Sequence, residues 1–237
     1  MSEYCIELNN ITKKFGKFTA VQDVNIKLEP GKVYGFVGPN GAGKSTLMNM
    51  LSGFISPDSG QIKIINQDLS LHPLECKKNI GFLPEGSPLY PDMNVESFLK
   101  YIGKLKGATS EQLSKAITTA QITDVLKQKI ETLSKGYQRR VGFAQSILTN
   151  PPILLLDEPT DGLDPNQKEH IQKVIRKMAT TKTILISTHL LDEAETIADR
   201  IIIMDKGKIK ADGSLSAVLQ QTQSIDLSEA FKKLTTK

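Results

Sequence analysis

The stretch Gly38-Pro-Asn-Gly-Ala-Gly-Lys-Ser-Thr46 directly follows the apolar run Val33-Tyr-Gly-Phe-Val37. Its spacing is G-x-x-x-x-G-K-[ST], which a random sequence of ordinary composition matches in roughly 4 of 100,000 windows. The spacing therefore favours a phosphate-binding loop at the end of a buried strand. A tight glycine turn with a solvated lysine is the alternative that this stretch alone leaves open.

A loop of this kind binds phosphate because glycine lets the backbone turn its N–H groups inward. A helix predicted to begin near Gly43 adds free N–H groups and the positive end of its dipole. Lys44 can then reach the β and γ phosphates of a nucleotide, and Ser45 can bind Mg²⁺. The residues expected to hold the nucleotide are Gly38, Pro39, Asn40, Gly41, Ala42, Gly43, Lys44, Ser45 and Thr46.

The composition is that of an ordinary globular protein, with 39% hydrophobic and 24% charged residues in 237. This length predicts one large domain, or one domain with an inserted lobe. The net charge is +4, and no run of five basic residues occurs, so a nucleic-acid-binding arm is not indicated. We interpret the basic residues as solvated surface charge, and the alternative is a basic face that contacts anionic lipid or RNA. Cys5 and Cys76 fit neither a metal site nor a disulfide framework, which favours a reducing cytoplasm.

The apolar segments are short. The runs Ile153-Leu-Leu-Leu156 and Ile201-Ile-Ile-Met204 have the length of strands and are too short to span a bilayer. The N-terminal "MSEYCIELNN" lacks the charged and apolar regions of a signal peptide. We therefore expect that the chain is not itself a membrane protein.

The order of apolar patterns predicts an α/β fold. Residues 1 to about 35 alternate as strands do and turn at Pro30-Gly31, and a second strand pair is expected to flank Pro57-Asp-Ser-Gly60. From about residue 91 to 146 the pattern is helical, with one apolar face expected from Phe98, Tyr101, Ile102 and Leu105. Beyond residue 150 strands and helices alternate, which indicates a parallel sheet covered by helices. The segments expected there are 153–157, 166–179, 183–187, 190–198 and 200–204.

Two acidic residues follow the strand expected over residues 153–157. Asp157 and Glu158 stand in "ILLLDEPTDGLDP", at the carboxyl end of that strand, where open α/β sheets bind ligands. Asp157 is placed to hold Mg²⁺, directly or through water, and Glu158 to act as the general base that orients the attacking water. "DEP" alone would also fit the acidic first turn of a capped helix.

His189 follows the next predicted strand, in "ILISTHLLDEAE". A histidine at that strand end can contact the γ-phosphate or hold the attacking water. A structural role for this side chain is the alternative.

With these residues assembled, the chain resembles the nucleotide-binding subunits of ABC transporters over about residues 5–215. "GPNGAGKST" is similar to the Walker A loop and "ILLLDEP" to Walker B, in which Glu158 is the catalytic glutamate. "DGLDP" is similar to the D-loop, with Asp164, and "STH" to the switch segment, with His189. "LSKGYQRRV", at residues 133–141, resembles the ABC signature, which few other P-loop proteins carry.

The signature-like stretch is expected to open a helix. Ser134 and Gly136 would then present a hydroxyl and N–H groups at a positive helix end, as a second phosphate site. In the family this surface closes over the ATP of a second subunit, which gives a head-to-tail dimer with two shared sites. A capped helix without a ligand would explain "LSKG" taken alone.

The chain departs from the family pattern at two places. Lys135 and Tyr137 replace the second glycine and the glutamine of the signature, as in the ABC-2 branch of export-type permeases. Glu85 stands where the Q-loop glutamine is expected, and it adds negative charge beside the expected Mg²⁺. Phe15 matches the aromatic residue that stacks on adenine, although an aromatic there also suits a strand.

The resemblance implies a P-loop NTPase core with a parallel sheet, an antiparallel β subdomain and an inserted α-helical subdomain. All 237 residues would form one ABC ATPase domain: the core with the β subdomain over about 1–84 and 150–215, the helical subdomain over about 86–149, and a C-terminal tail over about 216–237.

The expected function is hydrolysis of ATP with Mg²⁺ to drive a separate membrane permease. The signature and Q-loop variants favour an exporter over an importer. The expected partners are that permease and a second copy of the chain or a paralogous ATPase subunit, with no nucleic acid, on the cytoplasmic face of the membrane. The alternative is a soluble ABC ATPase that acts on nucleic acid, the ribosome or cluster assembly.

The segment Ser87-Pro-Leu-Tyr-Pro-Asp-Met93 is the expected site of permease contact. In the family a groove here receives a short cytoplasmic helix of the permease. We expect Leu89, Tyr90 and Met93 to be exposed for such a helix-in-groove contact, with packing of the lobe joint as the alternative.

Overall fold

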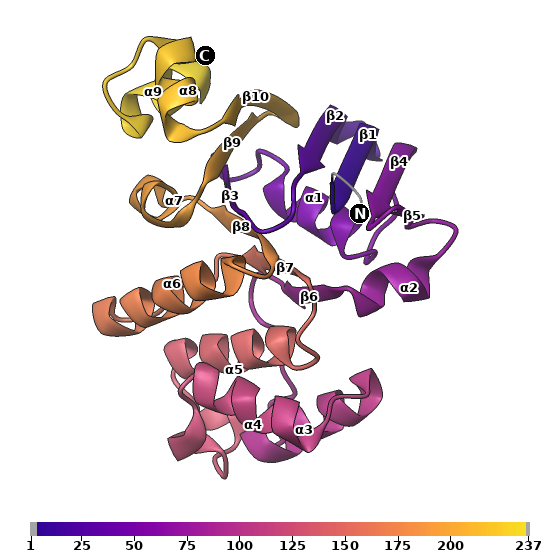
Figure 1. Ribbon diagram of the computed structural model, residues 1–237, viewed down its shortest axis with the longest axis vertical. Helices are drawn as coiled ribbons and strands as arrows, with labels where there is room; N and C mark the ends of the chain where they lie inside the picture. Colours follow the sequence, from indigo (N-terminus) through magenta and orange to yellow (C-terminus); the bar gives the residue numbers. More distant parts are fainter. Residues whose placement is uncertain (1–3, 236–237) are drawn as a thin grey trace.

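Two sheets form the framework of the computed structural model, which describes residues 4–235 (Figure 1). The larger sheet has the strand order β10-β9-β3-β8-β7-β6, and its pairs are parallel except for the β9–β10 hairpin. The sequence prediction of an α/β fold with a parallel sheet is confirmed. The strands are β3 (Val33–Val37), β6 (Ile80–Leu83), β7 (Ile153–Asp157), β8 (Thr183–Thr188), β9 (Arg200–Asp205) and β10 (Lys208–Gly213).

The smaller sheet is antiparallel and has the order β2-β1-β4-β5. Its strands are β1 (Ile6–Phe15), β2 (Phe18–Leu28), β4 (Ser59–Ile64) and β5 (Gln67–Asp68). The expected strand pair around residues 57–60 is wrong, because a helix and a turn precede Pro57 and only β4 follows it. β4 instead pairs with β1, a partner distant in sequence that local turn signals do not reveal.

Helices cover both faces of the larger sheet. Helix α1 lies between the two sheets, whereas α5, α6 and α7 pack on the opposite face, against β6, β8 and β3 respectively. The helices are α1 (Lys44–Leu51), α2 (Pro73–Lys78), α3 (Val95–Lys106), α4 (Ser110–Thr119), α5 (Lys135–Ile147), α6 (Pro165–Ala179), α7 (Leu191–Ile197), α8 (Leu215–Thr222) and α9 (Leu227–Thr235), with short 3-10 helices at Thr123–Val125 and Ile130–Thr132.

Strand β7 shows why this sheet must be covered on both faces. All five of its residues are buried, and successive side chains point to opposite faces of a strand. Leu155 joins the cluster that contains α1, while Leu154 and Leu156 join the cluster formed with α5 and α6. The continuous apolar run in the sequence is therefore the signature of a strand between two helical layers.

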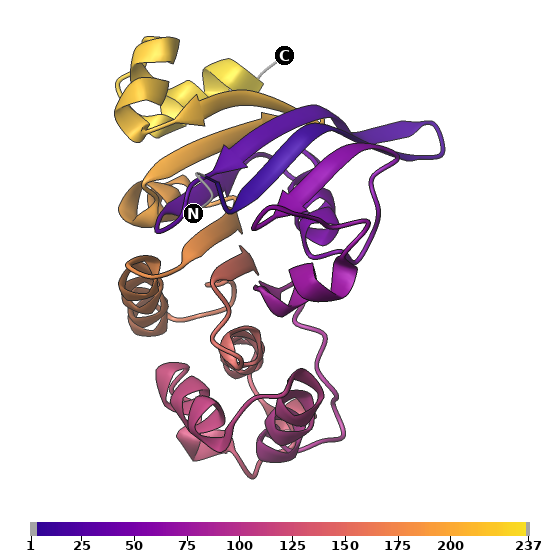
Figure 2. The same ribbon diagram turned by 45° about the vertical axis from the view of Figure 1, so that its right-hand side comes forward.

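Helices α3, α4 and α5 gather at one end of the molecule, far from α8 and α9 at the other end, in both ribbon views (Figures 1 and 2). The apolar face predicted for α3 is partly wrong. Phe98 is buried, but Tyr101 and Leu105 are 45% and 67% exposed, and the buried side of α3 also includes Val95 and Leu99. The residues that pack inward are thus rotated from the predicted stripe: Val95, Phe98 and Leu99 join the buried cluster that also contains residues of α5, a helix in contact with α3.

The region expected to be a C-terminal tail contains α8 and α9. Residues of both helices belong to a buried cluster with Val37, Ala194 and Ile203, so this segment packs on the core. The division of the chain near residues 84–86 and 149–150 remains a proposal, and residues 1–3 and 236–237 of the predicted domain lie outside the described residues. Among residues 4–235, none of the helices has the length and apolar character that crossing a membrane requires.

Candidate functional site

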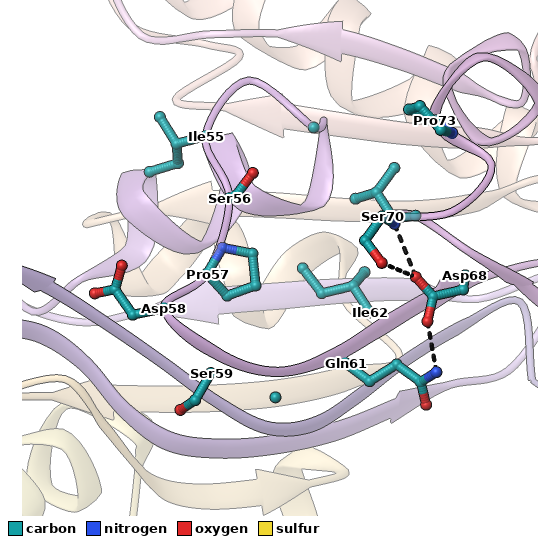
Figure 3. Close-up of a pocket in the computed structure, with 13 residues that line it drawn as sticks. Ile55, Ser56, Pro57, Asp58, Ser59, Gln61, Ile62, Asp68, Ser70 and Pro73 are labelled. Carbon is teal, nitrogen blue, oxygen red and sulfur yellow. Dashed lines mark hydrogen bonds between the residues drawn. The ribbon is translucent and has the colours of Figure 1, made fainter.

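Two cavities of the described residues differ in their chemistry. One, of about 570 Å³, lies against β4, β5 and the segment after α1 (Figure 3). Its Asp68 accepts hydrogen bonds from Ser70 and Gln61, and its Asp58 accepts from Lys13 Nζ and the Lys14 amide. A phosphate placed there would face carboxylates, which makes this cavity a poor anion site.

The second cavity, of about 430 Å³, is formed around the glycine-rich loop. Lys44 lines it from the first residue of α1, and Glu85 and Glu158 reach it from the segments after β6 and β7. The structure thus gathers one buried lysine and two carboxylates at the start of a helix. The lining residues are Phe18, Ala20, Asn40, Gly41, Ala42, Gly43, Lys44, Ser45, Thr46, Glu85 and Glu158.

Lys44 is buried and held by the loop that it follows. Its Nζ donates to the backbone oxygen of Gly38 at 2.7 Å and to that of Pro39 at 3.3 Å. Burial lowers the pKa of Lys44, and the nearby carboxylates, first Glu158 and then Asp157, oppose that shift. An incompletely compensated cation of this kind attracts an anionic ligand.

Two glycines of the loop are required by close contacts. A Cβ at Gly38 would lie 2.3 Å from the backbone oxygen of Met204, and one at Gly43 would lie 2.3 Å from that of Ala20. Gly43 also has φ of 105°, a conformation that residues with a side chain rarely adopt. The loop is therefore seated between β2 and β9 with no room for larger residues at these positions.

Glu158 emerges just after β7 in a strained conformation. Its φ is 52°, which is uncommon for a residue other than glycine, and its amide donates to the Ser187 backbone oxygen at 2.8 Å. Glu158 Oε1 and His189 Nδ1 are 2.9 Å apart. Burial raises the pKa of Glu158, and the hydrogen bond to His189 partly offsets this. A carboxylate with a raised pKa is suited to accept a proton near neutral pH.

Glu85 and Asp157 occupy different surroundings. Glu85 is exposed, and its Oε2 lies 3.5 Å from Ser45 Oγ, so it faces the loop as well as solvent. Asp157 is buried at the end of β7. A smaller cavity of about 150 Å³, which Glu85 and Glu158 also line, continues the Lys44 cavity toward His189. Within residues 4–235, no cluster of three or more His, Cys, Asp or Glu side chains suited to a metal ion occurs.

Three predicted site residues lie apart from this group. Ser134 caps α5, and Asp164 caps α6 by accepting from the Gln167 amide at 2.9 Å. Gly136 is buried, and a Cβ there would lie 3.0 Å from the Gly162 backbone oxygen. None of the three lines the cavities around Lys44, and Phe15, which is 52% exposed, is not a lining residue either.

The structure adds residues to the site that the sequence did not single out. Phe18, opposite Phe15 in the β1–β2 hairpin, lines the Lys44 cavity and is 61% exposed. Glu193 is buried in α7, and its two oxygens accept from Thr160 Oγ1 and Thr188 Oγ1, each at 2.7 Å. The short hairpin turn after Phe15 could have indicated Phe18, whereas the Glu193 contacts join segments that no local pattern links.

Comparison with known proteins identifies the family. The profile of the family described as "ABC transporter" matches residues 21–161, more than half of the chain. The chain belongs to the ABC transporter family. The match includes the loop at residues 38–46 and the strand end at Asp157 and Glu158, around which the site is built.

Relatives of this ABC protein are named as ATP-binding proteins of transport and resistance systems. The linearmycin resistance ATP-binding protein of Bacillus subtilis (strain 168) is 34% identical over 88% of this chain and 69% of its own length. The Nod factor export ATP-binding protein I of Paraburkholderia xenovorans (strain LB400) is 31% identical over 98% of this chain and 78% of its own. This chain is therefore an ABC transporter ATP-binding domain whose relatives include export-type proteins.

A solved structure shares the fold of this ABC protein. It is a dimeric ATP-binding cassette in a post-hydrolysis state bound to ADP and Pi, with a TM-score of 0.82 and 28% identity. The similarity covers 89% of this chain and 98% of that one. The predicted P-loop NTPase fold class is thereby confirmed.

We predict that Phe15→Ala and Phe18→Ala each weaken ATP binding, because Phe18 lines the Lys44 cavity and Phe15 pairs with Phe18 across the hairpin. Loss of base stacking on an aromatic ring costs about 1–3 kcal/mol. Isothermal titration with ATP and with tripolyphosphate separates the roles, since only ATP carries a base. Phe54→Ala, at an 80% exposed ring that does not line this cavity, is the control. Unchanged ATP affinity in Phe15→Ala would assign the stacking to Phe18 alone.

Proposed function

We propose that this chain hydrolyses MgATP as one half of a head-to-tail dimer and thereby drives a separate membrane permease, in an export system. One observation carries the proposal. Glu158, with its carboxylate bonded to His189, stands beside the buried Lys44 at the mouth of the glycine-rich loop. A phosphate-binding lysine and a general base are thus adjacent.

The reaction that these residues support is attack of water on the γ-phosphorus of ATP. The bond from the γ-phosphorus to the bridging oxygen breaks, ADP leaves, and Glu158 accepts the proton that the water loses. Lys44 and the amides of residues 40–46 neutralise the phosphate oxygens. His189 holds the attacking water or contacts the γ-phosphate, and its bond to Glu158 restrains both side chains.

The donor set fits Mg²⁺. This ion is usually held by one or two carboxylates together with substrate phosphates and water, so a cage of three acidic side chains is not required. Ser45, Asp157 and Glu85 would supply the oxygen ligands from this chain. When bound, the ion neutralises charge that develops on the transferring phosphate.

A dimer would complete each site. Ser134 and Gly136 lie at the start of α5, away from the Lys44 cavity of their own chain, and Asp164 lies at the start of α6. Helix starts present N–H groups and a positive dipole, which suits them to the phosphates held by a second subunit. The dimeric state of the similar cassette supports this arrangement. The partner subunit is a second copy or a paralogous ATPase.

The names of the relatives favour transport over the alternative of a soluble ATPase that acts on nucleic acid, the ribosome or cluster assembly. The chain would then work at the cytoplasmic face of a membrane, attached through its permease. The substrate would be recognised by that permease.

We expect Glu158→Gln to bind MgATP as the wild type does but to lose most hydrolysis. The amide cannot accept the proton, and general bases contribute about 10²- to 10⁴-fold to rate. Steady-state turnover, with nucleotide affinity measured separately, tests this, and the variant should accumulate as an ATP-bound dimer in size-exclusion chromatography. Asp192→Asn, at an exposed carboxylate of α7, is the matched control. Turnover near that of the wild type would remove Glu158 from its proposed role.

Replacing Glu85 should change the Mg²⁺ dependence of turnover. Its carboxylate lies beside Ser45 and adds negative charge at the proposed metal position. In Glu85→Gln we expect a Mg²⁺ half-saturation concentration about fivefold higher, because affinity for hard cations follows ligand charge. Asp161→Asn alters another carboxylate of the smaller cavity without touching Ser45. Superimposable Mg²⁺ titrations for Glu85→Gln and the wild type would contradict metal contact.

Of the three residues expected to contact the permease, only Tyr90 is exposed, so the proposed contact now rests on Tyr90. Leu89 and Met93, which were expected to be exposed, are half-buried against the cluster of the α3–α5 end, so that part of the expectation is wrong. They occupy this position because the segment after Glu85 closes over α3. Tyr90 is 49% exposed, with its ring edge-on to Phe98 at 5.7 Å and near Tyr101 at 6.1 Å.

Tyr90→Ala should weaken recovery of the permease with this chain from solubilised membranes while leaving basal ATP hydrolysis intact. The ring offers an exposed anchor, and aromatic residues dominate the energetics of many interfaces. Leu105→Ala, at another exposed apolar residue of the same end, is the control. Equal recovery of the permease with both variants would argue that Tyr90 only packs the joint between lobes.

A further inference from the structure

Two adjacent arginines of α5 are buried to the same extent but face different parts of the molecule. Arg139 and Arg140 are each 5% exposed. Arg140 turns toward the α3–α5 end, where its Nη1 donates to the Gln121 backbone oxygen at 2.6 Å and its guanidinium lies over the Tyr137 ring. Arg139 turns toward the carboxyl ends of β6 and β7. A buried cation needs partners, and those of Arg139 are at the candidate site.

Arg139 donates to both segments that carry the carboxylates of the site. Its Nε donates to the Glu158 backbone oxygen at 2.9 Å, and its Nη1 donates to the Pro84 backbone oxygen and to Ser87 Oγ, both at 2.8 Å. Pro84 and Ser87 enclose Glu85 in a turn closed by a Ser87 amide to Pro84 oxygen bond. One guanidinium therefore connects the Glu85 turn with the Glu158 backbone.

The two bonded segments share a backbone strain. Ser87 has φ of 41° and Glu158 has φ of 52°, both in the left-handed region that residues other than glycine seldom occupy. Such conformations persist only where the surroundings enforce them, and they concentrate at functional sites. Arg139 contributes to that enforcement at both positions, because its hydrogen bonds end on these two residues and on Pro84.

The charge of Arg139 matches its surroundings. Burial lowers the pKa of Arg139, and the carboxylates of Asp157, Asp161, Glu158 and Glu85 oppose that shift. The guanidinium also lines the cavity of about 150 Å³ that Glu85, Glu158 and His189 share, and its Nη2 has no hydrogen-bond partner among residues 4–235. Arg139 thus lies behind the reacting groups as a positive charge whose Nη2 group is unpaired within residues 4–235.

We propose that Arg139 is a positioning residue for ATP hydrolysis, which holds the Glu85 turn and the Glu158 backbone in one arrangement across the shared cavity. The inference rests on the proposed function. In this inference Arg139 places Glu158, and the loop at residues 38–46 holds the nucleotide. None of the three hydrogen bonds of Arg139 ends on that loop.

Arg139→Met and Arg140→Met form a matched pair of variants. Each removes one buried guanidinium of equal exposure from neighbouring positions of the same helix and keeps an unbranched side chain. General loss of stability should therefore be similar in both, and thermal melting measures it. Arg139→Lys keeps the charge but cannot bond Glu158 and the Glu85 turn together, so it should rescue turnover partially.

We expect Arg139→Met to lower kcat at least about tenfold, in line with the loss of buried charged hydrogen bonds. KM for MgATP and the binding stoichiometry of a trinitrophenyl-ATP probe should stay near wild type, which excludes a smaller folded fraction as the cause. Arg140→Met should keep the wild-type kcat. Equal loss of kcat in both variants, or a loss that follows the bound fraction of the probe, overturns the proposal.

Histidine ring resonances give a readout that does not depend on activity. The chain has three histidines, and His189 bonds Glu158 whereas His170 lies 3.3 Å from the side-chain nitrogen of Gln121, the residue that accepts from Arg140. Arg139→Met should move the His189 resonance and leave His170, and Arg140→Met should do the reverse. If the His189 ring resonance does not move in Arg139→Met, the proposal is overturned. If the wild-type chain does not hydrolyse ATP, the proposed function and this inference are both overturned. If the wild type is active but Arg139→Met and Arg140→Met have the same kcat, only the inference is overturned.

Discussion

Parallel pairing of β3, β8 and β7 is the constraint on which the rest of the molecule depends. Val37 pairs with Thr188, and Asp157 pairs with Ser187, so the three strands end at nearly the same level. The next residues along the chain, Gly38, Glu158 and His189, are consequently delivered to a single edge of the sheet. Since both faces of these strands are buried, a shift in register would displace the apolar residues of both helical layers. The chemistry of the edge is thus tied to the stability of the core.

At that edge, side chains of opposite charge lie close together in partly buried surroundings. Lys44 and Arg139 approach it from two helices on opposite faces of the sheet, and Asp157, Glu158 and Glu85 come from strand ends. Removing any one of these groups leaves others buried without their counterparts, which is costly in a low dielectric. The positions of the charged groups are therefore mutually dependent, and the ligand is the remaining partner of the set.

The sequence predicted those parts of the site that local rules determine. The glycine-rich loop, the strand before it and the helix that begins at Lys44 follow from the spacing of glycines and apolar residues within some twenty positions. The residues it missed act across long separations. Arg139 bonds Pro84 and Glu158, and β4 pairs with β1, which no periodicity encodes. Exposure of Tyr101 in α3 likewise depends on how α5 packs against that helix, a tertiary choice that the stripe of apolar residues leaves undetermined.

The buried carboxylate of Glu193 has a mechanical consequence. Its two oxygens bind Thr160, just beyond Glu158, and Thr188, just before His189, while its own backbone belongs to α7. Glu193 therefore links the three segments, so a rotation of α7 would act on the Glu158 and His189 segments at the same time. Motion of α7 would therefore reach the carboxyl ends of β7 and β8 together, through the two hydrogen bonds that Glu193 accepts.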